Sequence, residues 1–328
     1  MNHPLHTQRQ QGAALLMALL TVALVAVLAS AALWQQWRTL GVESAERDAQ
    51  QAHWLLAGAH DWARVVLRED ARTSTTDHLA EPWATPLREA RLSDFLAAAP
   101  GGSLTVTDGL AQQVFLSGRI TDMQSRLNLG NLVVEGQLQT AEMKSLERLY
   151  QVLGLPLTDL QAWTAAWQAA AQPTPAPQAP LLPQRFEQLA WLGVSPSSLA
   201  RLAPYLTVLP SGSTVNLNTA SAEVLYASVH SLNMSRAQSL VKERNQQPWD
   251  NMTDLRSRLG ADAAAVNDNR HGLSTRFFEV VGQIRQDNTT VLERSLVVRD
   301  GVQTKSVWRE RRALHSEPGC LTTIELPC

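Results

Sequence analysis

The stretch GAALLMALLTVALVAVLASAAL, residues 12–33, decides the architecture of this chain. Its last 21 residues contain no charged side chain. At about 1.5 Å per residue, a helix of that length crosses the roughly 30 Å hydrocarbon core of a bilayer. Trp34, Trp37 and Arg38 follow directly and suit a membrane–water interface. Because Arg9 is the only fixed charge before the run, a weak positive-inside signal places the leader in the cytoplasm and the remainder outside.

Three interpretations of this amino terminus remain open. Ala29-Ser30-Ala31 is a small-x-small site of the kind at which secretory signal peptides are cut. A plain membrane anchor is the second interpretation. The third is a type IV prepilin-like leader, which the junction of Gly12 and Ala13 resembles, because a polar leader (1–12) ends in glycine directly before the apolar run. This resemblance implies cleavage between Gly12 and Ala13, retention of residues 13–33 in the membrane, and N-methylation of Ala13.

The bulk composition describes a folded chain without electrostatic bias. Of 328 residues, 45% are hydrophobic and 18% charged, which supports a buried core and is atypical of disorder. The formal net charge of -2 supplies no global attraction for a nucleic acid. Most of the 10 tryptophans are expected to be core anchors.

Beyond the apolar run, the pattern predicts a long helix and two groups of strands. The helix is extended by an apolar stripe at helical spacing: Ala52, Leu55, Ala59, Trp62 and Val66. Alternation predicts short strands at Leu104–Val106 and Gln113–Ile120, around a turn at Asp108-Gly109. Turns at Asp287-Asn288 and Asp300-Gly301 separate a closing group of strands: Phe277–Ile284, Thr290–Arg299 and Thr304–Arg309.

The middle of the chain has the pattern of a helical domain. Residues 140–171 are rich in Leu, Ala and Trp at helical periodicity. Residues 172–184 contain five prolines, whose fixed φ angles and missing N–H donors exclude a helix or a central strand. We therefore expect an extended loop inside the helical domain.

Polar side chains cluster in TDMQSRLNLGNL, residues 121–132, where a strand passes into helical structure. Asp122, Asn128 and Asn131 have the chemistry of a catalytic or metal-binding set. They are also the residues whose side chains satisfy backbone groups in turns and caps. The structural interpretation is favoured.

The most informative motif is VNLNTASAEVL, residues 215–225. Thr219 is placed to cap a helix, and Glu223 falls in the first turns, where an acid complements the helix dipole. The motif resembles the start of a helix-hairpin-helix unit of competence-type DNA-binding proteins, and equally a helical domain related to sterile alpha motif folds. Helix-hairpin-helix units hold phosphate on backbone amides of a Gly-x-Gly hairpin. Here the hairpin position, residues 231–235, has no glycine, and residues 215–259 hold five basic and four acidic side chains. A membrane-anchored DNA-binding protein is therefore only the alternative function.

Cys320 and Cys328 are the only cysteines. They form no Cys-x-x-Cys pair and have no histidine at ligand spacing, so a zinc site is not indicated. In a chain that leaves the cytoplasm, two cysteines this close predict a disulfide that closes a small loop. The alternative is two free thiols on a terminal tail.

In their order along the chain, these segments resemble the type II secretion system protein K family. The match includes the leader, residues 121–132 and 215–225, and the closing strands with Arg276-Phe277-Phe278. Most pseudopilins carry Glu at the fifth mature position, where this chain has Met17. Protein K is the member known for lacking this Glu. The resemblance implies an α+β fold, with a pilin-like transmembrane helix, an antiparallel sheet and a large inserted all-α domain that resembles sterile alpha motif and helix-hairpin-helix folds. The implied domains are a leader (1–12), transmembrane helix (13–33), first head part (34–138), inserted helical domain (139–270), and closing strands with the disulfide tail (271–328).

The resemblance also implies a function. It describes a non-enzymatic minor pseudopilin in the inner membrane, with its head in the periplasm, that starts the pseudopilus and sits at its tip for export across the outer membrane. The implied partners are minor pseudopilins I, J and H, the prepilin peptidase and inner-membrane lipid, and no nucleic acid. No cofactor is required, although the family is compatible with calcium. Oxygen ligands such as Asp262, Asp268 and Asp287 have no spacing that marks a site.

Sequence motifs of common catalytic sites do not occur in this chain. There is no phosphate loop, Gly-x-Ser-x-Gly, His-Glu-x-x-His or EF-hand spacing. His60 precedes Asp61, but adjacent residues do not share a helix face, and no other group is expected to converge on them.

Overall fold

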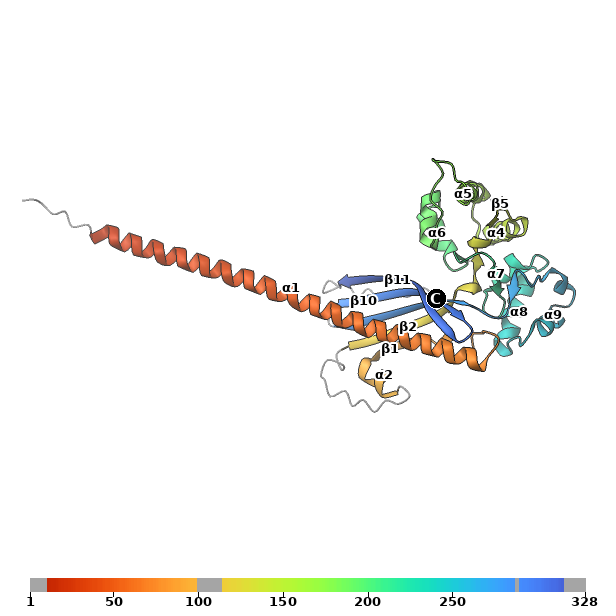
Figure 1. Cartoon of the computed structure of the whole chain (residues 1–328), viewed down its shortest axis with the longest axis horizontal. Coiled ribbons are helices and arrows are strands. Elements are labelled where there is room, and N and C mark those ends of the chain that lie inside the picture. Colours follow the sequence, from red (N-terminus) through yellow and green to blue (C-terminus); the bar gives the residue numbers. More distant parts are fainter. Residues whose placement is uncertain (1–10, 99–113, 287–288, 316–328) are drawn as a thin grey trace, which may run out of the picture. The chain divides into compact units, whose positions relative to one another are not determined.

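The computed structural model describes residues 11–98, 114–286 and 289–315 (Figure 1). The chain divides into two units, Met1–Leu55 and Leu56–Cys328. The first helix, α1 (Gln11–Thr73), runs without interruption through the boundary between them. Several predicted features lie outside the described residues: the strand at Leu104–Val106, the turns at Asp108-Gly109 and Asp287-Asn288, and both Cys320 and Cys328.

In the first unit, α1 confirms the predicted apolar helix. Its segment Ala13–Glu43 is long and apolar enough to cross a membrane, with a mean hydropathy of 2.6. The two hydroxyls in the apolar run are satisfied by the helix itself. Thr21 Oγ1 donates to the Ala18 carbonyl and Ser30 Oγ to the Ala26 carbonyl, each at 2.8 Å. Neither hydroxyl therefore depends on water or on a partner, as a lipid environment requires.

The second unit is built around an antiparallel sheet. Among the described residues this sheet has five strands, in the order β1-β2-β9-β10-β11. They are β1 (Leu87–Arg91), β2 (Val114–Asp122), β9 (Phe277–Gln286), β10 (Thr289–Asp300) and β11 (Gln303–His315). The predicted strand at Gln113–Ile120 and the closing strands are confirmed, and β11 is longer than expected. Gly301 in the predicted turn has a φ of 55°, a left-handed conformation that favours glycine.

Both faces of the sheet are covered. One face packs against α1 in a core of Ala63, Leu67, Trp83, Phe278, Val280 and Val297. The opposite face packs in a core of Met123, Leu209, Phe277 and Leu296. Coverage on both sides explains why the adjacent residues Phe277 and Phe278 are both buried. Trp83 belongs to the short helix η1 (Pro82–Ala84), and its ring meets that of Phe278 edge-on at 5.2 Å.

Between β2 and β9 the chain forms the expected helical domain. Its α-helices are α4 (Thr140–Leu153), α5 (Leu157–Ala170), α6 (Pro196–Leu202), α7 (Ala222–Ser228), α8 (Met234–Gln246) and α9 (Met252–Leu259). Short 3-10 helices accompany them: η2 (Met123–Ser125), η3 (Leu129–Asn131), η4 (Phe186–Leu192) and η5 (Gly260–Ala265). Its short strands pair as β3 (Leu127–Asn128) with β6 (Leu206–Thr207), β4 (Val133–Val134) with β5 (Gln137–Leu138), and β7 (Val215–Asn216) with β8 (His271–Gly272).

This domain has its own core, in which Trp163 and Trp249 are almost fully buried. Trp163 Nε1 donates to the Tyr150 hydroxyl at 2.7 Å. The proline-rich segment 172–184 contains turns and irregular structure, as predicted.

Two expectations from the sequence need correction. The sequence does not predict β1, because Leu87–Arg91 is rich in charge, or the short helix α2 (Leu92–Ala98) that follows. Nor are most tryptophans core anchors: only four are buried, namely Trp83, Trp163, Trp167 and Trp249. Five are exposed, namely Trp34, Trp37, Trp54, Trp62 and Trp191. Tryptophan suits interfaces as well as cores, because its amphipathic ring is stable at both.

Candidate functional site

The amino-terminal helix is the first functional element. Side chains of its apolar run are exposed along the helix, including Leu15 at 68% and Met17 at 66%. Gly12 and Ala13 both lie within α1. The helix therefore offers an apolar surface to lipid or to neighbouring helices, and position 17 adds no charge to it. Cleavage and N-methylation at this junction remain predictions.

A buried polar network ties the sheet to the helical domain. It is centred on Asp122, the last residue of β2, which is 2% exposed. Its Oδ1 accepts from Gln124 N at 2.6 Å and from Thr275 Oγ1 at 2.5 Å. Its Oδ2 accepts from Asn216 Nδ2 at 2.9 Å and from Thr219 Oγ1 at 2.5 Å. Burial raises the pKa of Asp122 to about 6, and the donated hydrogen bonds oppose that rise.

The other polar residues of the same segment confirm the turn-and-cap interpretation. Asn128 Oδ1 accepts from Gly130 N and Leu209 N at 2.9 and 2.8 Å. Asn131 Oδ1 accepts from Gly212 N, and its Nδ2 donates to the Ser213 carbonyl, both at 2.8 Å. These side chains satisfy backbone groups in residues 209–213, which are far away in the sequence. They therefore fix residues 128–131 against that segment of the helical domain.

The predicted cap at Thr219 is wrong. The N-cap of α7 is Ser221, whose hydroxyl accepts from Val224 N. Thr219 contributes its hydroxyl to Asp122 instead. Glu223 does lie in the first turn of α7, as predicted. The helix starts two residues later than the motif suggested, because the backbone N–H groups of Thr219 and Ala220 donate to the Asn216 carbonyl and form a turn before α7.

A second buried cluster contains three carboxylates, Asp70, Asp77 and Glu81, whose oxygens lie within 4.8 Å of one another. A carboxylate group of this kind can hold a cation. Here Arg299 supplies the positive charge: its Nη1 lies 2.7 Å from Asp70 Oδ2, and its Nη2 pairs with Asp77. Burial and the neighbouring Glu81 raise the pKa of Asp70 to about 6, against the effect of Arg299. Burial also raises the pKa of Asp77.

These acidic residues are not the ones that the sequence offered as oxygen ligands. Asp268 forms an ion pair with Arg256, and Asp287 lies outside the described residues. In the described ranges, Asp262 and Asp268 do not belong to a group of three or more acidic, histidine or cysteine side chains. Metal ligands stay unassigned.

Two groups converge on His60, contrary to the expectation from sequence. Ser295 Oγ is 2.9 Å from His60 Nδ1, and Glu293 Oε1 is 3.4 Å from its Nε2. The three residues have the composition of a catalytic triad, but each is at most 1% exposed. A serine without access to solvent cannot attack a substrate, so we assign the trio to packing between α1 and β10. Burial lowers the pKa of His60, and Glu293 opposes this effect.

Four of the five basic side chains in residues 215–259 are engaged within the domain, and Lys242 is exposed. Arg236 pairs with Glu243, Arg258 with Asp254, and Arg256 with Asp268. Arg244 is 3% exposed and donates to the Leu217 carbonyl, and burial lowers its pKa to about 10. Asn233, in the position of a glycine-rich hairpin, is instead the N-cap of α8. This arrangement is that of a packed interaction domain rather than a phosphate-binding face.

The structure has the architecture of a pilin-like subunit. Its amino-terminal helix is apolar and long enough to cross a membrane, the continuation of that helix packs on an antiparallel sheet, and a helical domain is inserted between two adjacent strands. Two family models, both described as Type II secretion system (T2SS), protein K, match residues 125–211 and 215–275. Over these ranges the chain is similar to the type II secretion system protein K family, and this similarity supports a minor pseudopilin role.

Curated relatives named Type II secretion system protein K agree with this assignment. The protein from Pseudomonas aeruginosa is 26% identical over 300 residues, which cover 84% of each chain. The protein from Klebsiella pneumoniae is 34% identical over 171 residues, which cover 50% of this chain and 45% of the relative.

A solved structure supports the fold. A chain in the crystal structure of the GspK-GspI-GspJ complex from the type 2 secretion system of enterotoxigenic Escherichia coli matches with a TM-score of 0.58. It is 17% identical, and the match covers 82% of this chain and 98% of the other.

Proposed function

We propose that this chain belongs to the tip complex that starts the pseudopilus of the type II secretion system. The observation that carries the proposal is α1, which connects an apolar, membrane-length segment directly to a head enlarged by the helical domain. Such a head is too wide to stack repeatedly along a thin filament. A terminal position accommodates it.

Met17 supports the same position. Family resemblance places a glutamate at this position in other pseudopilins, where it pairs with the amino terminus of an adjacent subunit. Met17 carries no charge and is exposed on α1, so it can contribute only apolar packing. A subunit at the tip has no subunit beyond it whose amino terminus would need a carboxylate.

The proposed partners follow from the same resemblance. In the crystal structure that this chain resembles, GspK forms a complex with GspI and GspJ. We propose that this chain assembles with the corresponding pseudopilins I and J, and also with H. Processing by the prepilin peptidase between Gly12 and Ala13 would precede assembly, and the retained helix would keep the subunit in inner-membrane lipid with its head in the periplasm.

The decisive measurement is the position and amount of this protein in sheared filaments. Immunogold labelling should find it at one filament end, at far lower abundance than the major subunit. Deletion of residues 139–269 should preserve membrane insertion but disturb the tip complex or filament length. Met17→Glu should not improve assembly, because it adds a charge without a counter-charge, whereas Met17→Leu should be neutral. Regular labelling along the shaft would overturn the tip position.

A further inference from the structure

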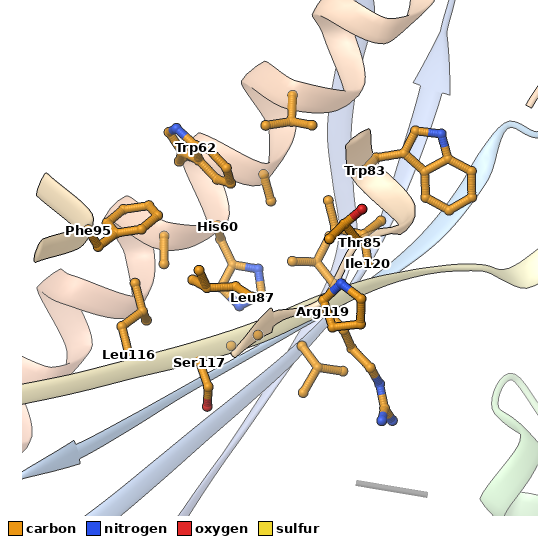
Figure 2. Close-up of a pocket in the computed structure, with 18 of the residues that line it drawn as sticks. His60, Trp62, Trp83, Thr85, Leu87, Phe95, Leu116, Ser117, Arg119 and Ile120 are labelled. Carbon is orange, nitrogen blue, oxygen red and sulfur yellow. The ribbon is translucent and has the colours of Figure 1, made fainter. Parts of the chain in front are cut away.

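Two cavities lie on opposite faces of the sheet. The larger, about 280 Å³, lies between α1 and the sheet, and Figure 2 shows its mainly apolar side chains, such as Trp62, Leu87 and Phe95. The smaller, about 80 Å³, lies beside Leu209 and Leu296 of the core on the other face. Several charged side chains line the smaller cavity, so its chemistry can select a ligand.

The charged side chains of the smaller cavity come from separate elements. Arg126 lies between η2 and β3, Arg185 is the N-cap of η4, and Arg294 belongs to β10. The carboxylates are those of Glu187 in η4 and Glu279 in β9. Among the described residues, three guanidinium groups and two carboxylates thus give the lining a formal charge of +1. This lining favours an anion.

Two of these guanidinium groups are held by carboxylates of the protein. Arg294 Nη1 lies 2.9 Å from Glu187 Oε1, and its Nη2 lies 2.6 Å from Glu279 Oε1. Arg185 Nη1 lies 3.3 Å from Glu310 Oε2, just outside the lining. Both arginines are therefore engaged within the folded chain.

Arg126 has no such partner among the described residues. Its guanidinium makes neither a hydrogen bond nor an ion pair with them. The side chain is half-buried, but its nitrogens are not enclosed. Burial lowers the pKa of Arg126, and Glu279, which lies beyond ion-pair distance, opposes this effect. A guanidinium stays charged at physiological pH, so its five N–H donors are available to an acceptor that enters the cavity.

The size and charge of the cavity indicate that this acceptor is a carboxylate. A guanidinium binds the two coplanar oxygens of a carboxylate through two parallel hydrogen bonds. A volume of about 80 Å³ is several times the roughly 10–15 Å³ that one water needs, so a carboxylate with one or two methylene groups fits. Met123 and Leu296 offer those methylene groups an apolar wall. Glu187 and Glu279 repel a dianion about twice as strongly as a monoanion, which disfavours phosphate.

We propose that this cavity binds a single carboxylate group through Arg126. The carboxylate can belong to an aspartate or glutamate side chain of a neighbouring pseudopilin or to a free small acid, because both present the same two oxygens. The first source rests on the proposed assembly function, whereas the second does not.

Propionate and propionamide test the site, because they share a shape and differ in charge. The full-length chain in nanodiscs carries ¹⁵N-labelled arginine, and the ionic strength is held constant. The side-chain signal of Arg126 is identified by its loss in Arg126→Met. We expect propionate to shift this signal saturably and to bind at least about tenfold more tightly than propionamide, which is the effect of charge-assisted hydrogen bonds. Equal affinity for both probes, or no saturable shift, would overturn the proposal.

Three variants test whether binding depends on Arg126. Arg126→Met keeps an unbranched stem but removes the charge, and Arg126→Lys keeps the charge but not the planar fork. In these variants the signals of Arg185 and Arg294, which line the same cavity, report binding. We expect Arg126→Met to abolish binding and Arg126→Lys to weaken it. Arg68→Met, at an exposed position of α1, should leave binding unchanged, and an equal loss there would count against the site.

Urea unfolding without propionate supplies a readout that a purely structural role would move. Among the described residues Arg126 has no ion pair to lose, so Arg126→Met should leave the urea midpoint unchanged or raise it. Arg294→Met should lower the midpoint, because it leaves the buried Glu279 without its cation. Equal losses in the two variants would show that Arg126 supports the fold, and the proposal would fail.

Co-purification of the full-length chain with pseudopilins I and J identifies the source of the carboxylate. If a partner supplies it, Arg126→Met weakens the complex, and one aspartate-to-asparagine or glutamate-to-glutamine change in that partner reproduces the loss. If the complex forms but is unaffected by Arg126→Met, the ligand is a free carboxylate and the proposed function stands. If the wild-type chain forms no complex, the proposed function fails, whereas the propionate assay still decides whether the site exists.

Discussion

Replacement of Asp122 by asparagine tests whether the buried network holds the head and the helical domain together. Each carboxylate oxygen of Asp122 accepts two hydrogen bonds: Oδ1 from Gln124 N and Thr275 Oγ1, and Oδ2 from Asn216 Nδ2 and Thr219 Oγ1. Asparagine keeps one acceptor oxygen and replaces the other with an NH₂ group. In either orientation of the amide, the new NH₂ group therefore takes the place of an oxygen that accepted two hydrogen bonds. The two buried donors of that pair then face another donor.

The expected loss of stability follows from the number of buried donors that are left without an acceptor. A buried donor without an acceptor costs about 1–3 kcal/mol. One member of each donor pair is a threonine hydroxyl, which can rotate toward another acceptor, as Thr219 can toward the Asn216 carbonyl at 3.3 Å. The other donor of each pair, Gln124 N or Asn216 Nδ2, cannot turn toward another acceptor in this way. We therefore expect Asp122→Asn to lower the free energy of unfolding by about 1–3 kcal/mol.

Urea unfolding of the full-length chain, followed by tryptophan fluorescence, measures this change. The buried Trp163 and Trp249 report on the helical domain and Trp83 on the sheet. The assay belongs at pH 7.5, above the pKa of about 6 that burial gives Asp122, so that the wild-type carboxylate is ionised. Asp250→Asn is the control, because it makes the same change on an exposed residue. A loss no larger than that of the control would refute the reasoning.

The remaining predictions concern processing, redox state and pH. The mature protein should begin at Ala13, and a bulky replacement of Gly12 should block cleavage; mass spectrometry showing a start behind the apolar run would support a signal peptide instead. Cys320 and Cys328 should be oxidised in exported protein, with a stabilisation of about 2–3 kcal/mol, and thiol titration of periplasmic material checks this. Burial and Arg270 lower the pKa of His271 from 6.5 to about 4. Between pH 4 and pH 6.5, His271 is therefore protonated in the unfolded state but neutral in the folded state. The free energy of unfolding should rise by about 3 kcal/mol as the pH increases through this window. His271→Gln should flatten that part of the urea-midpoint profile, and an unchanged slope would contradict the assignment.

Local patterns in the sequence predicted the elements that depend on local chemistry. The apolar run predicted the start of α1, alternation predicted β9 and β10, and prolines predicted the loop at 172–184. β1 was missed, because at the sheet edge a strand needs little apolar surface and its charged residues conceal the alternation.

The partners within the polar sites could not be predicted in the same way. The cap role of Asp122 was visible from its neighbours, but its contacts with Thr219 and Thr275 join residues far apart in sequence. The contact between Glu293 and His60 likewise forms only when β10 packs against α1. Nothing in the periodicity of either segment specifies such a contact. Pairing of this kind is a property of the fold, and the sequence shows only that the groups are present.

The insertion point of the helical domain has a consequence for the order of folding. β2 and β9 are direct neighbours, with Asp122 opposite Phe278, so the domain is topologically a loop inside a hairpin that contains almost half of the chain. Closing that hairpin around an unfolded loop is entropically costly, whereas a folded domain brings its two ends together beforehand. While the chain is being synthesised and exported, β2 therefore cannot pair with β9. This pairing becomes possible only after β9, which begins at residue 277, has been made and the helical domain has folded. Over that interval an apolar strand edge is open to incorrect pairing, and this is the stage at which a chaperone would benefit the protein most.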